Sequence, residues 1–558
     1  MRVPLLIAAI TLFGLALSAT SHDLSAGPAI ASTLLGPICH ADAPPPIAGP
    51  HRLVMLPGMG DDHMAADTAK PEAQRWFDYG LTLARSFEHN DAVLAFQRSE
   101  AVDPACSLCV WGEAYAHGPT INFDVDPAQT AADLALARRA QALAGPRLGA
   151  VGRALEASLI DRYRAADAVA ADRAYARDMD ALVRAAPADP EAAVFDAEAW
   201  LIVENDGDAS AAARAVAVLK PLVATHLDNS GLVHFYIHAT ENAGVPELAA
   251  PYAERVAELA PGASHMVHMP SHTWFRIGRY EAAAQANVAA LKADRAYAER
   301  TDFPTPLGRL MYHFHDVQFG LGSAMMAGDA KLALWFVRQF NQDFPSPATY
   351  DPRAAIAADA AYAALGRFAP PQAVLEAPDA PLGNPLLAAM RHYARGEAFV
   401  RLGRAADVRR ESGAIGAILE ALPAASRNTT AAVVAQLAQL TLAGDADLMD
   451  RDPASAIKAF SAAADLQDAR LASNIDPPRW WYPVRRSLAA ALLARGDAAG
   501  AEREASRTLA TWKLDPKTLM IRAAAERKLG SAAASLDEAA ARRGWHGDPA
   551  ALQPAELL

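Results

Sequence analysis

The stretch QRWFDYGLTLARSFEHNDAVLAFQRSEAVDP, residues 74–104, decides the fold. It carries an aromatic residue at Trp76 and a small one at Gly80, then Ala92 and Phe96 after a short break, and it closes on a proline. Alternating β-branched residues are absent, so the pattern predicts two helices joined by a turn. The small residues allow the two helices to cross closely, while the aromatic residues fill the gap to a neighbouring unit.

This pattern resembles the tetratricopeptide repeat (TPR), a helix-turn-helix of roughly 34 residues. Three pairs of small residues recur at a spacing of 34: Gly244 and Gly278, Ala249 and Ala283, and Gly496 and Gly530. Further units are expected around residues 190–225, 314–345, 380–405, 430–466 and 480–512. One such helix pair cannot bury its apolar face alone, so the units must stack. The sequence therefore predicts an all-α, TPR-like solenoid, a superhelix with a concave groove.

The first residues have the form of an export signal. One positive charge, an apolar run and then small residues make 1–19 a predicted signal peptide, although an uncleaved anchor stays open. Residues 20–70 form a predicted irregular segment, 71–345 the N-terminal TPR-like repeats with a histidine-rich groove, and 346–558 the C-terminal repeats. No later segment is apolar over a length that spans a bilayer. We therefore expect a periplasmic or secreted protein with no membrane span after signal cleavage.

Charge and cysteine usage exclude several classes of protein. The net charge is -13 and no basic patch occurs, which argues against nucleic acid as a partner. Haem attachment is excluded because Val110 follows Cys109 where histidine is required. In an oxidising compartment Cys106 and Cys109 can pair with each other, or one of them with Cys39. The sequence leaves these pairings open.

Two stretches, HFYIHATE at 234–241 and HMVHMPSH at 265–272, concentrate the histidines. His234 and His268 are 34 positions apart, as are His238 and His272, so each pair occupies one repeat position. Histidines four apart share a helix face, and neighbouring helix axes lie about 8–10 Å apart. The register predicts a metal site in the groove, with these ligands: His234, His238, His265, His268 and His272.

Two other residues of these stretches have predicted catalytic roles. Glu241 lies on the histidine face and is the candidate base that moves a proton, while Tyr236 is a candidate for orienting substrate. Farther on, MYHFHD contains His313 and His315, which either complete the site or flank it; His315 matches His265 if Gly328 matches Gly278. Copper and zinc both fit imidazole ligands, and the sequence leaves open whether the protein is an enzyme.

A non-catalytic scaffold is the alternative interpretation. TPR arrays commonly hold a peptide or protein partner in the groove, and the repeated histidines would then be copies by descent that pack or form hydrogen bonds. Grooves that clamp peptides are usually rich in Lys, Arg and Asn, whereas histidine and glutamate stand here. The expected groove ligand is therefore a small molecule or peptide, with a protein partner as the alternative.

The chain also resembles an uncharacterised family of secreted bacterial TPR proteins over about residues 70–545. The segments that carry the resemblance are FDYGLTLARSFEHNDAVLAF, CSLCVWGEAYAHGPTIN, HFYIHATE, HMVHMPSHTWFRIGRYEAA and DPPRWWYPVRRSLAAALLARG. The resemblance implies the fold but no activity. We expect these segments to face one groove, with the following residues beside the histidine helices: His89, Trp111, Gly118, Asn122 and Trp480 to Arg486.

Overall fold

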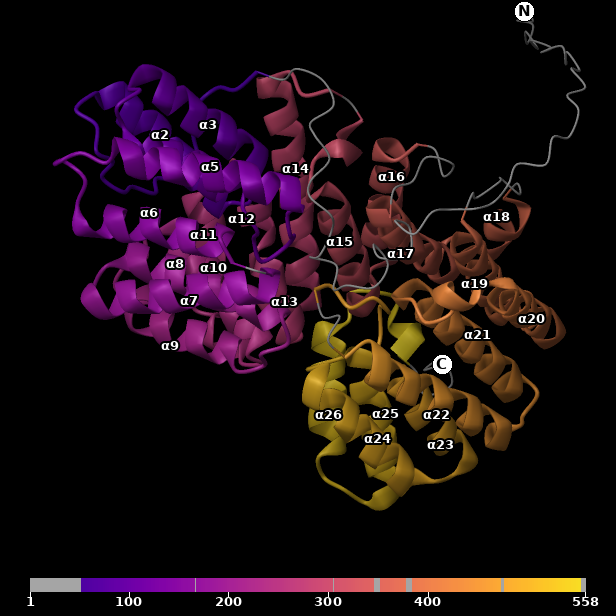
Figure 1. The fold of residues 1–558 in the computed structure, drawn as a ribbon. Coiled ribbons are helices and arrows are strands. Elements are labelled where there is room, and N and C mark those ends of the chain that lie inside the picture. Colours follow the sequence, from indigo (N-terminus) through magenta and orange to yellow (C-terminus); the bar gives the residue numbers. More distant parts are fainter. Residues whose placement is uncertain are drawn as a thin grey trace, which may run out of the picture.

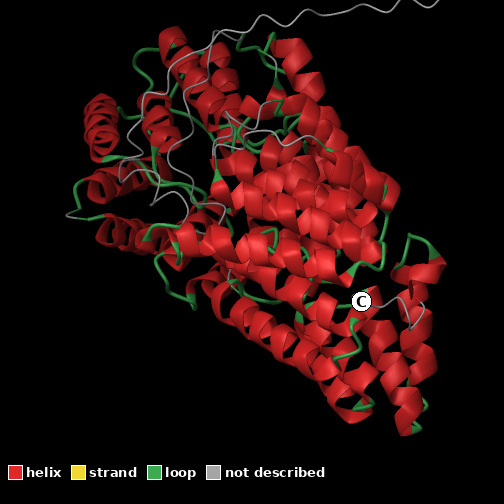
Figure 2. Cartoon of the chain, turned by 90° about the vertical axis from the view of Figure 1, so that its right-hand side faces the viewer, coloured by secondary structure: helices red, strands yellow, loops and turns green. Residues whose placement is uncertain are grey.

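The computed structural model describes residues 52–165, 167–304, 306–345, 352–377, 384–472 and 476–552. The predicted signal peptide, Cys39 and the first part of the irregular segment lie outside these residues. Throughout the described residues the chain forms helices joined by turns, without a β-strand (Figure 2). The all-α prediction is confirmed.

The structure places the helices as follows: α2 (Pro71–Arg85), α3 (His89–Val102), α4 (Ser107–His117), α5 (Pro127–Leu143), α6 (Ala150–Tyr163), α7 (Ala168–Ala185), α8 (Pro190–Asn205), α9 (Ala211–Val223), α10 (Ser230–Asn242), α11 (Ala253–Leu259), α12 (Ser264–His268), α13 (Pro270–Arg276), α14 (Tyr280–Thr301), α15 (His313–Ala327), α16 (Ala330–Asp343), α17 (Pro352–Phe368), α18 (Pro371–Glu376), α19 (Pro385–Arg401), α20 (Ala405–Ala421), α21 (Thr430–Met449), α22 (Pro453–Arg470), α23 (Arg485–Arg495), α24 (Ala498–Thr511), α25 (Pro516–Leu529) and α26 (Ala534–Gly544). Short 3-10 turns are η1 (Pro246–Leu248), η2 (Leu307–Arg309), η4 (Ala424–Ser426) and η5 (Pro549–Leu552).

Consecutive helices pack in pairs, and the pairs stack. The predicted first unit becomes α2 and α3, and the later ones include α8 with α9, α15 with α16, α21 with α22 and α23 with α24. The first helices of successive pairs also touch, as α17, α19 and α21 do. Figure 1 shows the chain passing from α2–α13, through α14 and α15, to α16–α26. This is a TPR-like solenoid.

Small residues permit the close crossings that the sequence predicted. A Cβ atom on Gly80 would lie 2.9 Å from the ring of Phe96, and one on Gly112 would lie 2.3 Å from the same ring. The ring of Phe96 therefore occupies space that only glycine leaves at these two positions. Gly244 and Gly278 have φ of +71° and +83°, so both repeat positions end their helices in the left-handed region that glycine favours.

The hydrophobic core has two large parts that meet near the histidine helices. One runs from Met59 to Met269, and the other from Ala253 to Ala525. Within the first, Cys106 and Cys109 form a disulfide. Of the pairings left open by the sequence, the structure has the one that closes CSLC on itself.

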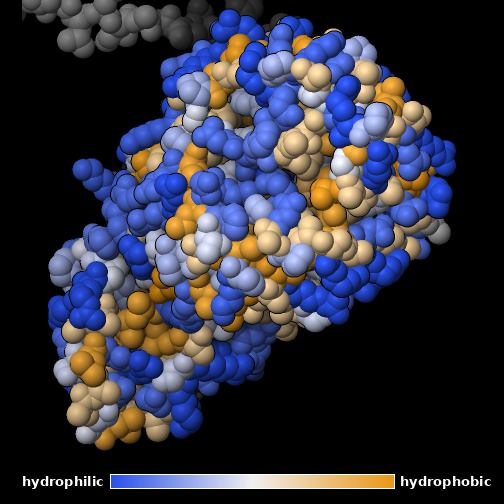
Figure 3. Space-filling model, turned by 90° about the vertical axis from the view of Figure 1, so that its left-hand side faces the viewer, coloured by the Kyte–Doolittle hydropathy of each residue, from blue (hydrophilic) through white to orange (hydrophobic). Residues whose placement is uncertain are grey.

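The surface is mostly polar. Figure 3 shows one face on which hydrophilic residues predominate and hydrophobic ones form separate patches, in keeping with the net charge of -13. Within the described ranges, none of the helices combines the length and the apolar character that crossing a membrane requires.

Candidate metal centre

Four helices bring the histidines together. The side chain of Asn229 accepts a hydrogen bond from the Leu232 amide at 2.8 Å and so starts α10. The stretch HMVHMPSH is divided between α12 and α13, because Pro270 has no N–H to continue the helical hydrogen bonds. The first helix of the following repeat unit is α15, which carries His315. The histidines are thus arranged along three successive units rather than two.

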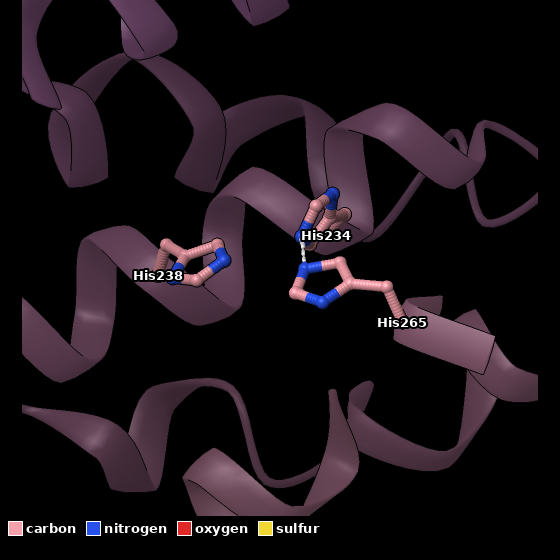
Figure 4. Close-up of side chains that lie close together, drawn as sticks. All are labelled: His234, His238 and His265. Atoms are coloured by element: carbon pink, nitrogen blue, oxygen red, sulfur yellow. Dashed lines mark hydrogen bonds between the residues drawn. The ribbon is translucent and has the colours of Figure 1, made fainter. Parts of the chain in front are cut away.

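The first cluster consists of His234 and His238 from α10 and His265 from α12. One ligand nitrogen from each lies within 4.8 Å of the others. His234 Nε2 lies 3.1 Å from His265 Nε2, and Figure 4 shows the three rings around a common space. Each side chain is at most 4% exposed. These residues are enclosed by helices, so they do not line the open groove that the sequence predicted.

The second cluster consists of His268 from α12, His272 from α13 and His315 from α15. Their ligand nitrogens also lie within 4.8 Å of one another. His268 Nε2 is 2.9 Å from His272 Nε2 and 3.1 Å from His315 Nε2. Two nitrogens bound to one ion at about 2.1 Å and a tetrahedral angle lie about 3.4 Å apart. Small ring movements would therefore let each cluster hold one metal ion.

The two clusters are successive copies of one pattern. Each takes two histidines, four positions apart, from one unit and a third histidine from the next. His265 and His315 both lie 13 positions before a left-handed glycine, Gly278 or Gly328. This confirms the conditional alignment of His315 with His265. In the third unit, the positions of His268 and His272 hold Gln318 and Gly322, so the pattern does not continue there.

Hydrogen bonds behind the rings fix the direction of three histidines. His234 Nδ1–H donates to the Arg85 carbonyl at 2.7 Å, and His272 Nδ1–H donates to Glu241 Oε2 at 2.5 Å. His268 Nδ1–H donates to Asn287 Oδ1 at 2.7 Å. A neutral imidazole has a single N–H, so the Nε2 atom of each carries a lone pair toward its cluster. Metal-binding histidines are oriented by partners of this kind.

This arrangement creates a conflict between His268 and His272. Both use Nδ1–H as a donor, so in their neutral forms both Nε2 atoms are acceptors and no hydrogen bond joins them across 2.9 Å. His268 Nε2 also faces His315 Nε2. A cation between these atoms, whether a proton or a metal ion, removes the repulsion.

Burial keeps most of the cluster neutral. It lowers the pKa of His234 and of His315 to about 3, and it lowers the pKa of three further histidines well below the usual range: His238, His265 and His268. His272 differs: burial lowers its pKa, but Asp476 and Glu241 outweigh that effect and raise it. Neutral imidazole is the form that binds a metal, so these five histidines need not lose a proton near neutral pH.

Asp476 connects the two clusters. A carboxylate oxygen of Asp476 lies within 4.8 Å of a ring nitrogen of His238, from the first cluster, and of a ring nitrogen of His272, from the second. Asp476 Oδ1 also lies 3.4 Å from His315 Nε2. Asp476 Oδ1 also lies 3.4 Å from His272 Nδ1, the nitrogen that is bound to Glu241. This carboxylate comes from the C-terminal part of the chain, before α23, and lies beside both clusters.

Each cluster also packs against one phenylalanine. The ring of Phe87 lies 4.6 Å from that of His234 and 4.7 Å from that of His265, between centroids. Phe319 lies 5.1 Å from both His268 and His272. Phe87 has φ of +62°, which bulky residues rarely adopt. The two rings keep water away from the imidazoles.

The predicted catalytic residues have different positions from those expected. Glu241 is 2% exposed and lies behind His272, bound to Nδ1 on the ring edge opposite the cluster. Arg276 Nε lies 3.5 Å from Glu241 Oε1 on the other side. Tyr236 packs against Tyr252, with ring centroids 5.9 Å apart, and belongs to neither cluster. The structure thus gives Glu241 an orienting position and does not bring Tyr236 to the histidines.

His313 lies outside the clusters, although His315 completes one. Its Nδ1 contacts Asp294 Oδ2 at 2.6 Å and its Nε2 contacts Asp343 Oδ2 at 3.0 Å. Burial lowers the pKa of His313, but these hydrogen bonds raise it to about 9. A charged imidazole with both nitrogens engaged is not a metal ligand.

The expected convergence of segments in one groove is only partly right. Asn122 lines a small pocket with His238 and His265. Trp111 instead lies in the core and donates to the Leu155 carbonyl, while Trp481 and Arg486 line a separate cavity. The residues that sequence reasoning missed are Asp476, Phe87, Phe319 and Tyr312, whose ring lies 4.7 Å from that of His265 between centroids. Asp476 had a signal, since it opens the segment DPPRWWYPVRR.

Comparisons with known proteins add no family. No family model and no curated protein matches the chain. Among solved structures, the human IFIT1 dimer with m7Gppp-AAAA is 12% identical, covering 78% of this chain and 89% of that one, with a TM-score of 0.33. The P58(IPK) TPR domain is 12% identical, covering 82% and 98%, with a TM-score of 0.20. Naa15/Naa10 bound to HypK-THB is 12% identical, covering 85% and 73%, with a TM-score of 0.22. Similarities of this size say nothing of the site, ligands or partners of this chain.

Proposed function

We propose that the protein binds two metal ions in paired trihistidine sites and that this centre performs its function. The observation that carries the proposal is the pair of Nε2 atoms of His268 and His272, 2.9 Å apart, with both Nδ1 atoms already committed as donors. Six buried imidazoles in two adjacent sets are costly without a cation. The repetition of the set gives a second site of the same kind.

Copper is the metal that the ligands favour. Both triads consist of imidazoles, five of the six kept neutral by burial, and divalent copper binds such nitrogens more tightly than zinc does. Zinc with three histidines and an open position also exists, and hydrolysis would then need a base facing the ion. Glu241 does not supply it, because its carboxylate is hydrogen-bonded to His272 Nδ1, and Asp476 would itself be engaged as a ligand group. We therefore assign copper, with a redox function, ahead of zinc with a hydrolytic one.

In this function the chain's own groups have separate tasks. The six histidines would hold the ions, with Asp476 as a further ligand group beside both clusters, and Glu241 and Asn287 keep His272 and His268 oriented. Phe87 and Phe319 exclude water from the two sets. Tyr236 has no task in the centre.

Elemental analysis of the purified, untagged protein tests the proposal. We expect two copper ions per chain in the wild type, one in His238→Ala, one in His272→Ala and none in the double variant. His63→Ala is the matched control, because His63 is exposed and is hydrogen-bonded to Asp78 at the surface, away from both clusters. Circular dichroism and thermal unfolding of each variant establish that the fold persists.

The single variants decide whether there are two sites. Complete loss of metal in each single variant would replace the paired sites by one shared site. A metal-free wild type, or retention of both ions in the double variant, would refute the centre. Zinc in place of copper at both sites would keep the centre but overturn the redox assignment.

A cavity in the C-terminal half favours a second function, binding of a peptide partner. The cavity has a free volume of about 430 Å3, and residues of the inner helices α17, α19, α21, α23 and α25 line it. Arg367 and Arg486 contribute positive charge beside the carboxyl groups of Glu397 and Asp445, and burial lowers the pKa of Lys517 well below its usual range. The guanidinium carbons of Arg367 and Arg486 lie 4.8 and 5.6 Å from the ring of Trp481. Such a surface fits an extended peptide with a carboxylate.

Fluorescence anisotropy with labelled carboxylate-bearing peptides tests this second function. We expect Arg367→Ala to weaken binding at least tenfold (~1.4 kcal/mol), while the exposed Arg404→Ala is the control. Equal binding by both variants would exclude the cavity as the peptide site.

For location, we propose export from the cytoplasm. The support is the pattern of residues 1–19, a positive charge followed by an apolar run and small residues. Fractionation of cells that express the full chain, with a variant lacking residues 1–19, tests it. A protein found in the cytoplasm in both cases would overturn the proposal.

A further inference from the structure

A small pocket leads to the histidines from the side of the loop before α15. It touches both clusters, because His238 and His265 of the first and His315 of the second line it, together with Asp476. Its free volume is about 30 Å3. One water molecule needs about 10–15 Å3 of such space. The pocket therefore has room for two or three atoms and excludes an organic substrate.

The walls of this pocket are largely apolar. Phe123, Met311 and Phe314 surround it, and the polar Asn122 Nδ2 is committed as a donor to the Tyr312 hydroxyl at 2.6 Å. Arg353 also lines the pocket, with its guanidinium 5.8 Å from the ring centroid of Phe314. Apart from Arg353, the lining offers few donors in exchange for the hydration shell that an anion would lose here. An uncharged molecule of two atoms enters without that cost.

The pocket ends on ligand groups rather than on a closed wall. His238 Nε2 is buried and has no hydrogen-bond partner within the described part of the chain. Because histidines from both triads form this end, a molecule in the pocket faces both metal positions at once. A diatomic molecule presents one atom to each.

We propose that this pocket is the entry and binding site for dioxygen at the paired sites in their copper(I) form. The inference rests on the proposed copper centre and specifies its ligand. Dioxygen is apolar, uncharged and diatomic, so it fits the small volume of the pocket, its apolar walls and its inner end, which histidines of both clusters form. Larger substrates stay outside, beyond Met311 and Phe314.

Carbon monoxide is the probe, because it has the same size, binds copper(I) and needs no electron transfer. The full chain is loaded with copper(I) under argon, its copper content is measured, and carbon monoxide binding is followed by the infrared C–O stretch. We expect binding by the wild type. In Met311→Trp, which plugs the half-buried mouth, we expect at least tenfold slower binding with unchanged copper content. Met311→Ala should bind at least as fast as the wild type.

The controls separate this inference from the metal centre itself. Leu536→Trp adds the same ring at a position that is 73% exposed and should leave the rate unchanged. Fully loaded wild type that binds no carbon monoxide, or Met311→Trp that binds it at the wild-type rate, overturns the dioxygen pocket while the copper sites stand. Binding of azide to the copper(II) form without carbon monoxide binding also overturns it in favour of a small anion. Wild type that takes up no copper overturns the centre and the pocket together.

Discussion

Replacing Glu241 by glutamine should weaken one metal site and leave the other intact. Glu241 accepts the Nδ1–H of His272 at 2.5 Å, and both side chains are at most 2% exposed. A hydrogen bond to a charged group contributes about 1.5–3 kcal/mol and one between neutral groups about 0.5–1.5 kcal/mol. Since the amide oxygen of glutamine can still accept, the loss is the difference, about 1–1.5 kcal/mol. That corresponds to roughly tenfold in affinity.

Two backgrounds make the effect specific to a site. In His238→Ala only the second triad, with His272, is complete, so Glu241→Gln should lower copper affinity about tenfold in a chelator competition. In His272→Ala only the first triad is complete, and the same substitution should change nothing. Glu411→Gln is the matched control, because Glu411 accepts from His392 Nδ1 at 2.6 Å far along the chain from the histidine clusters.

Two results would refute this reasoning. An unchanged affinity in the His238→Ala background would show that Glu241 does not orient a ligand. An equal loss in both backgrounds would show that the substitution acts on the fold as a whole, and unfolding of Glu241→Gln in urea would then reveal it.

Three further predictions concern stability. Gly320→Ala should lower the free energy of unfolding in urea by about 1–3 kcal/mol, because the added Cβ would lie 2.2 Å from the ring of Phe336. Gly413→Ala is the control: its Cβ would have no described atom within 4 Å, so the substitution should be neutral or stabilising. Equal effects would contradict the packing argument. Burial, followed by the nearby Asp180, raises the pKa of Asp196 to about 7, so the native state keeps a proton that the unfolded chain releases. Stability should therefore fall as pH rises from about 4 to about 7, and Asp196→Asn should fall less; parallel pH profiles would contradict this assignment. Copper at 100 times its dissociation constant should stabilise the protein by about 2.7 kcal/mol for each occupied site, hence by about 5.4 kcal/mol for the wild type with its two sites, and should leave His238→Ala/His272→Ala unchanged. Thermal unfolding with and without chelator measures this, and an equal shift in both proteins would place the binding elsewhere.

Much of the fold could be predicted because its signals are local. The spacing of Gly80, Ala92 and Phe96 reflects how two helices cross, and the 34-residue recurrence reflects how units stack. The glycines at 244, 278, 496 and 530 all have left-handed φ, as the ends of repeated helices require. The division at residue 345, the signal peptide and membership of a secreted family stay predictions.

The candidate site was predicted less completely. The repeat register placed the pair His234 and His238 above the pair His268 and His272, and both pairs do lie on helix faces that point into clusters. The register could not show whether five histidines form one site or two. It also could not choose between His313 and His315, since the insertion before α15 obscures the alignment.

The sequence by itself determined the helical repeat and, through it, which histidines share a face, because helical periodicity depends only on spacing along one chain segment. Only the tertiary structure decided the division into two triads, the entry of Asp476 and the position of Glu241 behind His272. It also turned Tyr236 toward Tyr252. These outcomes depend on distances between helices, which are set by the packing of Phe87, Phe319 and the stacked units rather than by spacing. The repeat therefore determines which histidines of the candidate metal site share a helix face, and the packing of the stacked units brings them together.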